Sequence, residues 1–150
     1  FKLNIPFSVF VITDFVTQSK KEYVDEVMLK EFAEHPLVTI GSHSCSHAKL
    51  TSCSLMDMKN EISDSKHYLE DLIGKEISAF SYPHGLFNQA VKQEVIKAGY
   101  KLGFTSHFDI NLINKDRFTL NTIELWNTDN LTNFKKKING DWDWLKYRNQ

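Results

Sequence analysis

Short apolar segments typical of buried strands alternate with amphipathic helical segments along most of the chain, and this alternation constrains the fold most. Strands are expected at residues 5–13, 37–43, 77–83 and 100–106, which are rich in β-branched and aromatic residues. Helices are expected between them, at residues 20–35, 54–74 and 88–99. Strands joined by helices of this length pair in parallel through right-handed crossovers. The sequence therefore predicts an α/β fold, and we favour a barrel or a barrel fragment.

The expected helices have recognisable ends. Pro36 stops the first, Ser54 and Asn88 are suited to cap the next two, and Gly74 and Gly99 end them. The apolar stripe expected on the first helix consists of Val24, Val27, Met28 and Phe32.

The pattern becomes looser after Ser106. Residues 117–126 alternate in polarity like a strand, and residues 130–138 form a helical pattern with Leu131, Phe134 and Ile138 on one side. Lys135, Lys136 and Lys137 are expected on a solvated face of that helix. No repeat or linker divides the chain, so residues 1–150 are expected to form a single domain.

Composition excludes several partners. With 41% apolar and 25% charged residues, the composition is that of a globular domain. The net charge of -1 gives no electrostatic field that would attract nucleic acid or an anionic membrane. No apolar run is long enough to span a bilayer. The chain begins with Phe1 and not Met, so we expect that a segment precedes it.

Two histidines follow the second expected strand. His43 and His47 stand four residues apart in "GSHSCSH", where parallel α/β folds build sites from the loops after their strands. Neutral imidazoles bind zinc and other divalent ions. Backbone hydrogen bonds alone could also satisfy both rings. A closed zinc site with Cys45 and Cys53 is a further alternative, which the crowded spacing disfavours; both cysteines are more simply small, partly buried hydrophobes.

A second motif makes a family resemblance specific. The order of "GSHSCSH", a capped helix, "FSYPHG" and "EVIKAGYKLGFTS" resembles the polysaccharide deacetylase family, the NodB homology domain of carbohydrate esterase family four. The resemblance covers residues 4–106. It implies a distorted (β/α) barrel that removes acetyl groups from N-acetylated sugars of a bacterial surface polysaccharide or oligosaccharide.

The resemblance also implies roles for individual residues. His43 and His47 match the two histidine ligands of a divalent metal ion, commonly zinc. The backbone N–H of His84 matches the donor that stabilises the oxyanion, and Gly85 would permit the tight turn. Tyr82 and Pro83 would shape the sugar groove.

The chain departs from the family at three points. Ser81 replaces the arginine usual in the third motif. The motif Thr-Phe-Asp-Asp, whose aspartates supply the third metal ligand and the general base, belongs to a first strand that we expect upstream of Phe1. Asp14 follows the wrong strand to replace either aspartate. The family's late Leu-x-x-His motif is absent, so no motif assigns the general acid. His107, just after the fourth expected strand, is a candidate, and an ordinary exposed loop histidine is the alternative. A truncated, non-catalytic module that binds glycan or serves as a scaffold is the alternative function.

The remaining aromatic and histidine residues are expected to have structural roles. Packing is expected for Trp126, Trp142 and Trp144, although aromatic faces can also stack on sugars. His35 and His67 are expected on helix surfaces.

Overall fold

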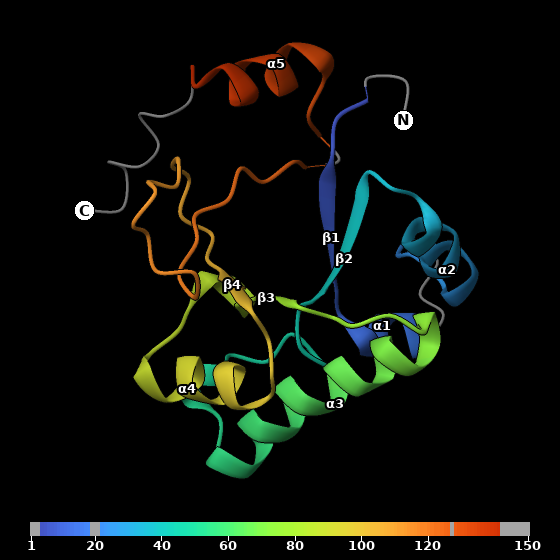
Figure 1. Ribbon diagram of the computed structural model, residues 1–150, viewed down its shortest axis with the longest axis vertical. Coiled ribbons are helices and arrows are strands. Elements are labelled where there is room, and N and C mark those ends of the chain that lie inside the picture. Colours follow the sequence, from blue (N-terminus) through green and yellow to red (C-terminus); the bar gives the residue numbers. More distant parts are fainter. Residues whose placement is uncertain (1–3, 19–21, 127, 142–150) are drawn as a thin grey trace.

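The computed structural model describes residues 4–18, 22–126 and 128–141 as an α/β unit built on a parallel sheet (Figure 1). In chain order, its elements are β1 (Phe7–Val11), α1 (Thr13–Thr17), α2 (Glu26–Glu34), β2 (Val38–Ser42), η1 (Leu50–Ser52), α3 (Leu55–Ile73), β3 (Ala79–Ser81), η2 (Pro83–Gly85), α4 (Gln89–Lys97), β4 (Leu102–Phe104) and α5 (Leu131–Asn139).

The sheet has four strands in the order β1-β2-β3-β4, and all neighbouring pairs are parallel. Val11 pairs with Ser42, Ser42 with Phe80, and Phe80 with Gly103, so one row of residues crosses the whole sheet. The carboxyl ends of the strands therefore lie at one edge. The expected parallel α/β architecture is confirmed. Within the described residues the sheet is open, with β1 and β4 at its edges, so closure into a barrel is not observed there.

Helix α3 spans the expected length because both of its ends have suitable caps. The Ser54 hydroxyl accepts the Asp57 N–H at 3.1 Å, and Gly74 ends the helix in the left-handed region with φ 68°. Asn88 caps α4 as expected, since its side-chain oxygen accepts the Val91 N–H at 3.0 Å. Figure 1 shows α3 along the bottom of the molecule, with α4 near one end and α1 near the other.

The first predicted helix is shorter than expected, and its buried stripe differs. It begins after Asp25, whose carboxylate accepts the Met28 N–H at 2.8 Å, and this cap was not predicted. Val27 is 67% exposed and Met28 42%, whereas Leu29 is completely buried. Val24 and Phe32 pack against the core as expected, but Val27 and Met28 do not, and Leu29 takes the buried position between them and Phe32. The short helix α1 was also not predicted.

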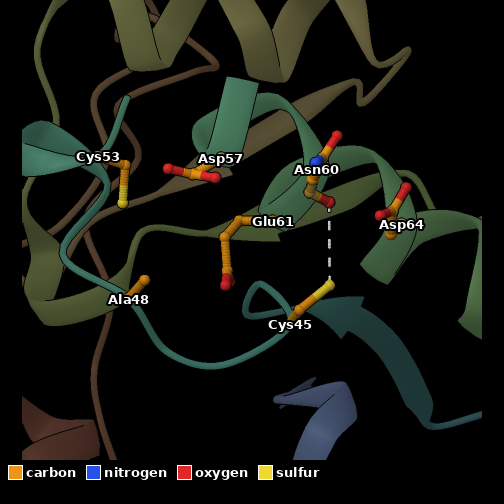
Figure 2. A pocket seen from close by; sticks show the side chains of 7 residues that line it. All are labelled: Cys45, Ala48, Cys53, Asp57, Asn60, Glu61 and Asp64. Atoms are coloured by element: carbon orange, nitrogen blue, oxygen red, sulfur yellow. Dashed lines mark hydrogen bonds between the residues drawn. The ribbon is translucent and has the colours of Figure 1, made fainter. Parts of the chain in front are cut away.

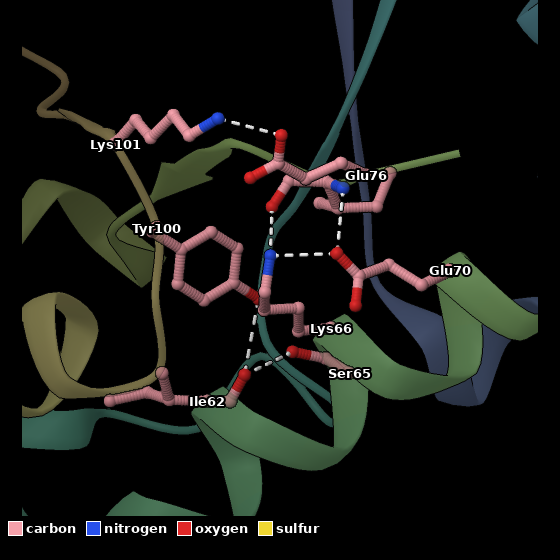
Figure 3. Close-up of polar contacts among 8 residues, drawn as sticks. Ile62, Ser65, Lys66, Glu70, Glu76, Tyr100 and Lys101 are labelled. Atoms are coloured by element: carbon pink, nitrogen blue, oxygen red, sulfur yellow. Dashed lines mark hydrogen bonds and ion pairs between the residues drawn. The ribbon is translucent and has the colours of Figure 1, made fainter.

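A buried lysine ties α3 to the strands that carry the site (Figure 3). Lys66 is 8% exposed, donates to the carbonyl of Ile77, and forms an ion pair with Glu70 at 2.8 Å. Its ammonium lies 4.8 Å from the centre of the Tyr100 ring, a cation–π contact. Because Ile77 precedes β3 and Tyr100 precedes β4, this network fixes the entry of both strands.

The segment 117–126 does not form the predicted strand. Only Leu120 forms a bridge, parallel to Phe104 of β4. The Leu120 N–H donates to the carbonyl of Gly103 and the Leu120 carbonyl accepts the Thr105 N–H, both at 2.8 Å. Side chains bind neighbouring N–H groups instead of a strand partner: the Asp116 carboxylate accepts the Phe118 N–H, and the Asn111 side chain accepts the Asn121 N–H. Alternating polarity was therefore insufficient to define a strand here.

Two further expectations for the C-terminal part are corrected. Lys137 is only 2% exposed, and its ammonium pairs with the Asp129 carboxylate at 2.5 Å. It therefore does not belong to the expected solvated lysine face. Trp126 is 62% exposed and does not pack in the core, while Trp142 and Trp144 lie outside the described residues. No described helix combines the length and the apolar character needed to cross a membrane.

Candidate active site

His43 is the first residue after β2, and the sheet holds both its backbone and its ring. Its N–H donates to the carbonyl of Val11 at 2.8 Å, and its Nδ1 lies 2.8 Å from the carbonyl oxygen of Ser81. A carbonyl can only accept, so Nδ1 carries the proton and Nε2 keeps its lone pair. Burial lowers the pKa of His43 to about 4, so the ring is neutral at pH 7. Its Nε2 is therefore available to a metal ion.

The loop of residues 43–47, which we call the histidine loop, brings the second ring back to the first. Ser44 and His47 both adopt positive φ, 67° and 65°. The Ser44 hydroxyl accepts the His47 N–H at 3.1 Å, and the Ser42 hydroxyl accepts the Ser44 N–H at 3.2 Å. Two N–H groups of α1, from Thr13 and Asp14, bind carbonyls of the same loop. Hydrogen bonds thus hold a conformation that these residues adopt rarely.

Three imidazoles lie together at this edge of the sheet. The ring centres of His43 and His47 are 4.7 Å apart, and those of His47 and His84 are 4.4 Å apart. The pKa of His47 is lowered, first by burial and then by the proximity of His84. Sequence reasoning assigned His84 a backbone role and missed this side-chain contact, because nothing in the spacing of "GSHSCSH" and "FSYPHG" fixes the direction of the His84 ring.

The turn that carries His84 presents its backbone to the same region. His84 has φ 58° and ψ 13°, and within the described residues its N–H donates no hydrogen bond to the protein. Gly85 has φ 66°, and a Cβ there would lie 2.8 Å from Cβ of Ser106. Glycine is required both for the backbone angle and for this close approach, as expected. The free N–H of His84 is thereby kept at the carboxyl end of β3.

Tyr82 and Pro83 lie beneath the site turn, and their expected part in shaping a sugar groove stays a prediction. Both side chains are fully buried. The Tyr82 hydroxyl donates to the carbonyl of Phe118 at 2.9 Å, and its ring stacks on Phe87 with centres 5.0 Å apart. Apolar surface and a satisfied hydroxyl favour this inward orientation. The two residues support the turn from beneath, and His84 is the exposed side chain at its tip.

His107 follows β4 and is exposed. Its N–H donates to the Thr105 hydroxyl at 3.3 Å, and its carbonyl accepts the Thr122 N–H at 3.0 Å. Since Ser106 lies against Gly85, the segment that carries His107 adjoins the turn. Within the described part of the chain, however, His107 makes no ring contact with the three imidazoles.

Two other histidines were expected on helix surfaces. His67 is exposed on α3, as expected, whereas His35 lies just beyond the end of α2 and is partly buried.

The two cysteines lie in a separate pocket of about 300 Å³ beside α3 (Figure 2). It is lined by Cys45, Ala48, Cys53, Asp57, Asn60, Glu61 and Asp64. The Cys45 thiol points to the carbonyl of Asn60, and burial raises its pKa to about 11, so it is no thiolate at neutral pH. Both are free and partly buried, as expected.

The described residues contain no group of three or more His, Cys, Asp and Glu side chains that could hold a metal ion. This contradicts a closed site made of His43, Cys45, His47 and Cys53. Two neutral imidazoles of the kind that His43 and His47 present have the chemistry to fill two of the four positions of a tetrahedral zinc site.

Comparisons with known proteins agree on one family. The family model for polysaccharide deacetylase matches residues 2–103. A putative polysaccharide deacetylase of Bacillus subtilis is 29% identical over 86 residues, which are 57% of this chain and 30% of that protein. A Streptococcus pyogenes deacetylase, solved in complex with acetate, superposes with a TM-score of 0.80 at 24% identity, over 91% of this chain and 60% of that one.

The same fold also occurs in a pseudoenzyme of carbohydrate esterase family 4 from Bacillus anthracis, with a TM-score of 0.58 at 15% identity, over 66% of this chain and 33% of that one. The chain thus spans less than two thirds of each of these proteins. The structural likenesses establish the fold, and the family model covers well over half of the sequence. The chain belongs to the polysaccharide deacetylase family.

Proposed function

We propose that this chain supplies two metal ligands and the oxyanion donor of an enzyme that hydrolyses acetamide groups on N-acetylated sugars of a bacterial surface polysaccharide. The observation that carries the proposal is the meeting of His43 and His47 with the unpaired N–H of His84 at one sheet edge. Family membership supports the reaction class.

His43 and His47 would hold the metal ion, with zinc as the leading candidate. The ion would act as a Lewis acid on the acetamide carbonyl and would lower the pKa of a water molecule. The bond from the His43 Nδ1 proton to Ser81 leaves Nε2 as the donor atom and fixes the ring direction. Because both rings are held neutral, binding would release no proton from them at pH 7.

The His84 N–H would donate to the oxygen of the acetamide carbonyl as it becomes negatively charged during attack by water. The carbon–nitrogen bond then breaks, giving acetate and an amine that takes up a proton. His107 is the candidate donor of that proton, and the carboxylates for the third metal ligand and the general base are proposed to come from upstream of Phe1.

The second candidate is a module that binds glycan or serves as a scaffold without turnover. The absence of a three-ligand metal group in the described residues favours it. The likeness to a pseudoenzyme shows that the fold is compatible with loss of catalysis in that protein.

The test measures acetate released from N-acetylated oligosaccharides by the full-length protein. His43→Ala and His47→Ala should each lower the rate by roughly a hundredfold or more, because each removes a metal ligand. Cys53→Ser is the matched control and should retain the rate. Binding of the oligosaccharides without acetate release by the metal-loaded wild type would favour the second candidate instead.

A further inference from the structure

Glu61 of α3 binds the residue that precedes the second histidine. One carboxylate oxygen, Oε2, accepts the Ser46 N–H at 2.9 Å, and the other, Oε1, accepts the Ser46 hydroxyl at 2.6 Å. Figure 2 shows the Glu61 side chain extending from α3 towards the loop between Cys45 and Ala48. A single side chain thus engages both the backbone and the side chain of Ser46.

This contact lies where the histidine loop needs support. Ser44 and His47, on either side of Cys45 and Ser46, both have positive φ, which is unfavourable for residues other than glycine. The N–H groups of α1 hold Ser44 and Cys45 in the first half of the loop. In the second half of the loop, the backbone N–H of Ser46 binds a charged side chain, that of Glu61. Hydrogen bonds to a charged acceptor are stronger than neutral ones.

The neighbouring carboxylates do not share this role. Asp57 accepts the hydroxyl of Ser54 at the start of α3, and Asp64 lines the same pocket without a hydrogen bond to the loop in the described residues. Asp64 therefore offers a control of equal charge on the same helix.

We propose that Glu61 is a positioning residue of the deacetylase site: by fixing Ser46 it sets the orientation of the His47 ring relative to His43 and His84. This inference rests on the proposed function. It places one determinant of the site on α3, outside both histidine-containing motifs.

The experiment compares Glu61→Ala, Glu61→Gln and Asp64→Asn in the full-length protein. Three quantities are measured: kcat and KM on an N-acetylated oligosaccharide, zinc affinity by competition with a chelator, and hydrogen exchange of a peptide covering residues 42–48. Glu61→Ala should lower kcat and zinc affinity by about tenfold, the low end of losses seen when groups supporting metal ligands are removed. It should also accelerate exchange of that peptide.

Glu61→Gln should stay within about threefold of the wild type, because the amide oxygen can still accept from Ser46. Asp64→Asn should match the wild type. Ser46→Ala removes one of the two bonds and should add little further loss to Glu61→Ala, since coupled partners are not additive. Thermal melting of each variant identifies a general loss of folding.

Three results would overturn the proposal: full activity and zinc affinity in Glu61→Ala, losses in Asp64→Asn as large as those in Glu61→Ala, or unchanged exchange of residues 42–48 in Glu61→Ala. If the wild type neither hydrolyses the substrate nor binds zinc, the proposed function fails, and the positioning role in that reaction fails with it. The exchange experiment then shows separately whether Glu61 holds the loop.

Discussion

The histidine loop and the segment of residues 107–126 follow strands of the same sheet, but they are held in different ways. Backbone N–H groups, serine hydroxyls and Glu61 fix the histidine loop from several sides. The later segment leaves large apolar side chains in solvent: Ile113 is fully exposed, and Leu112 is 67% exposed. A short loop rich in hydrogen-bonding groups therefore defines its own geometry, whereas apolar residues need a surface against which to pack.

The largest change in stability is expected in the packed sheet beneath the site turn, and almost none at the exposed tip of the later segment. Phe80 is fully buried in β3, next to the site turn, and packs on Tyr82 and Tyr100. Phe80→Ala should lower the free energy of unfolding by about 3–5 kcal/mol, because it leaves a cavity. Ile113→Ala should change it by less than about 0.5 kcal/mol. Urea unfolding measures both. Equal effects would contradict the contrast between the packed sheet beneath the site and the exposed apolar residues of the later segment.

A smaller effect is expected at the bond that joins the site turn to the later segment. The Tyr82 hydroxyl donates to the carbonyl of Phe118 from inside the fold. Tyr82→Phe should destabilise the protein by about 1–3 kcal/mol, since it leaves a buried carbonyl without that donor. The same unfolding assay tests it, with Tyr23→Phe, at a side chain 48% exposed, as the control. No change in Tyr82→Phe would show that the segment is not anchored there.

Patterns among neighbouring residues were enough to predict the strands and helices that carry the site. The caps Ser54 and Asn88 and the terminal Gly74 act through neighbouring residues, so their effect is visible in the sequence. The positions of His43 and His47 after β2 follow from the same strand and helix alternation.

Contacts between distant residues could not be predicted in this way. Tyr82 turns inward because Phe118, 36 residues later, offers an acceptor. Lys137 is buried because Asp129 and the carbonyl of Glu124 receive its ammonium. The contact between the His84 and His47 rings depends on the pairing of β2 with β3. Each of these depends on the tertiary fold and not on a local pattern.

At the site turn, backbone and side-chain roles of His84 can be separated. His84→Gly and His84→Ala both remove the ring and keep the N–H, and alanine at the observed φ of 58° is no more strained than the histidine it replaces. If the N–H is the oxyanion donor, both variants should retain activity within about threefold, since the donor stays in place. Steady-state acetate release decides this. A loss of about tenfold or more in both variants would contradict the backbone role.

The smallest effects are expected at the cysteines. Cys45→Ser and Cys53→Ser alter side chains of the pocket beside α3 and leave the paired imidazoles in place. Both variants should keep metal content and activity within about twofold, because raised thiol pKa values disfavour the thiolate that binds zinc. Metal analysis of purified variants checks this. Loss of the metal in either one would reopen a cysteine-containing site.

The histidines, not the cysteines, are proposed to hold the metal at this edge of the sheet. X-ray absorption at the zinc edge of the zinc-loaded full-length protein tests it most directly, because zinc–sulfur distances of about 2.3 Å differ from zinc–nitrogen distances of about 2.0–2.1 Å. We predict a shell of light atoms that includes two imidazoles and no sulfur, and loss of the imidazole signal in the double variant His43→Ala and His47→Ala. A sulfur shell, or a spectrum unchanged by those substitutions, would contradict the account.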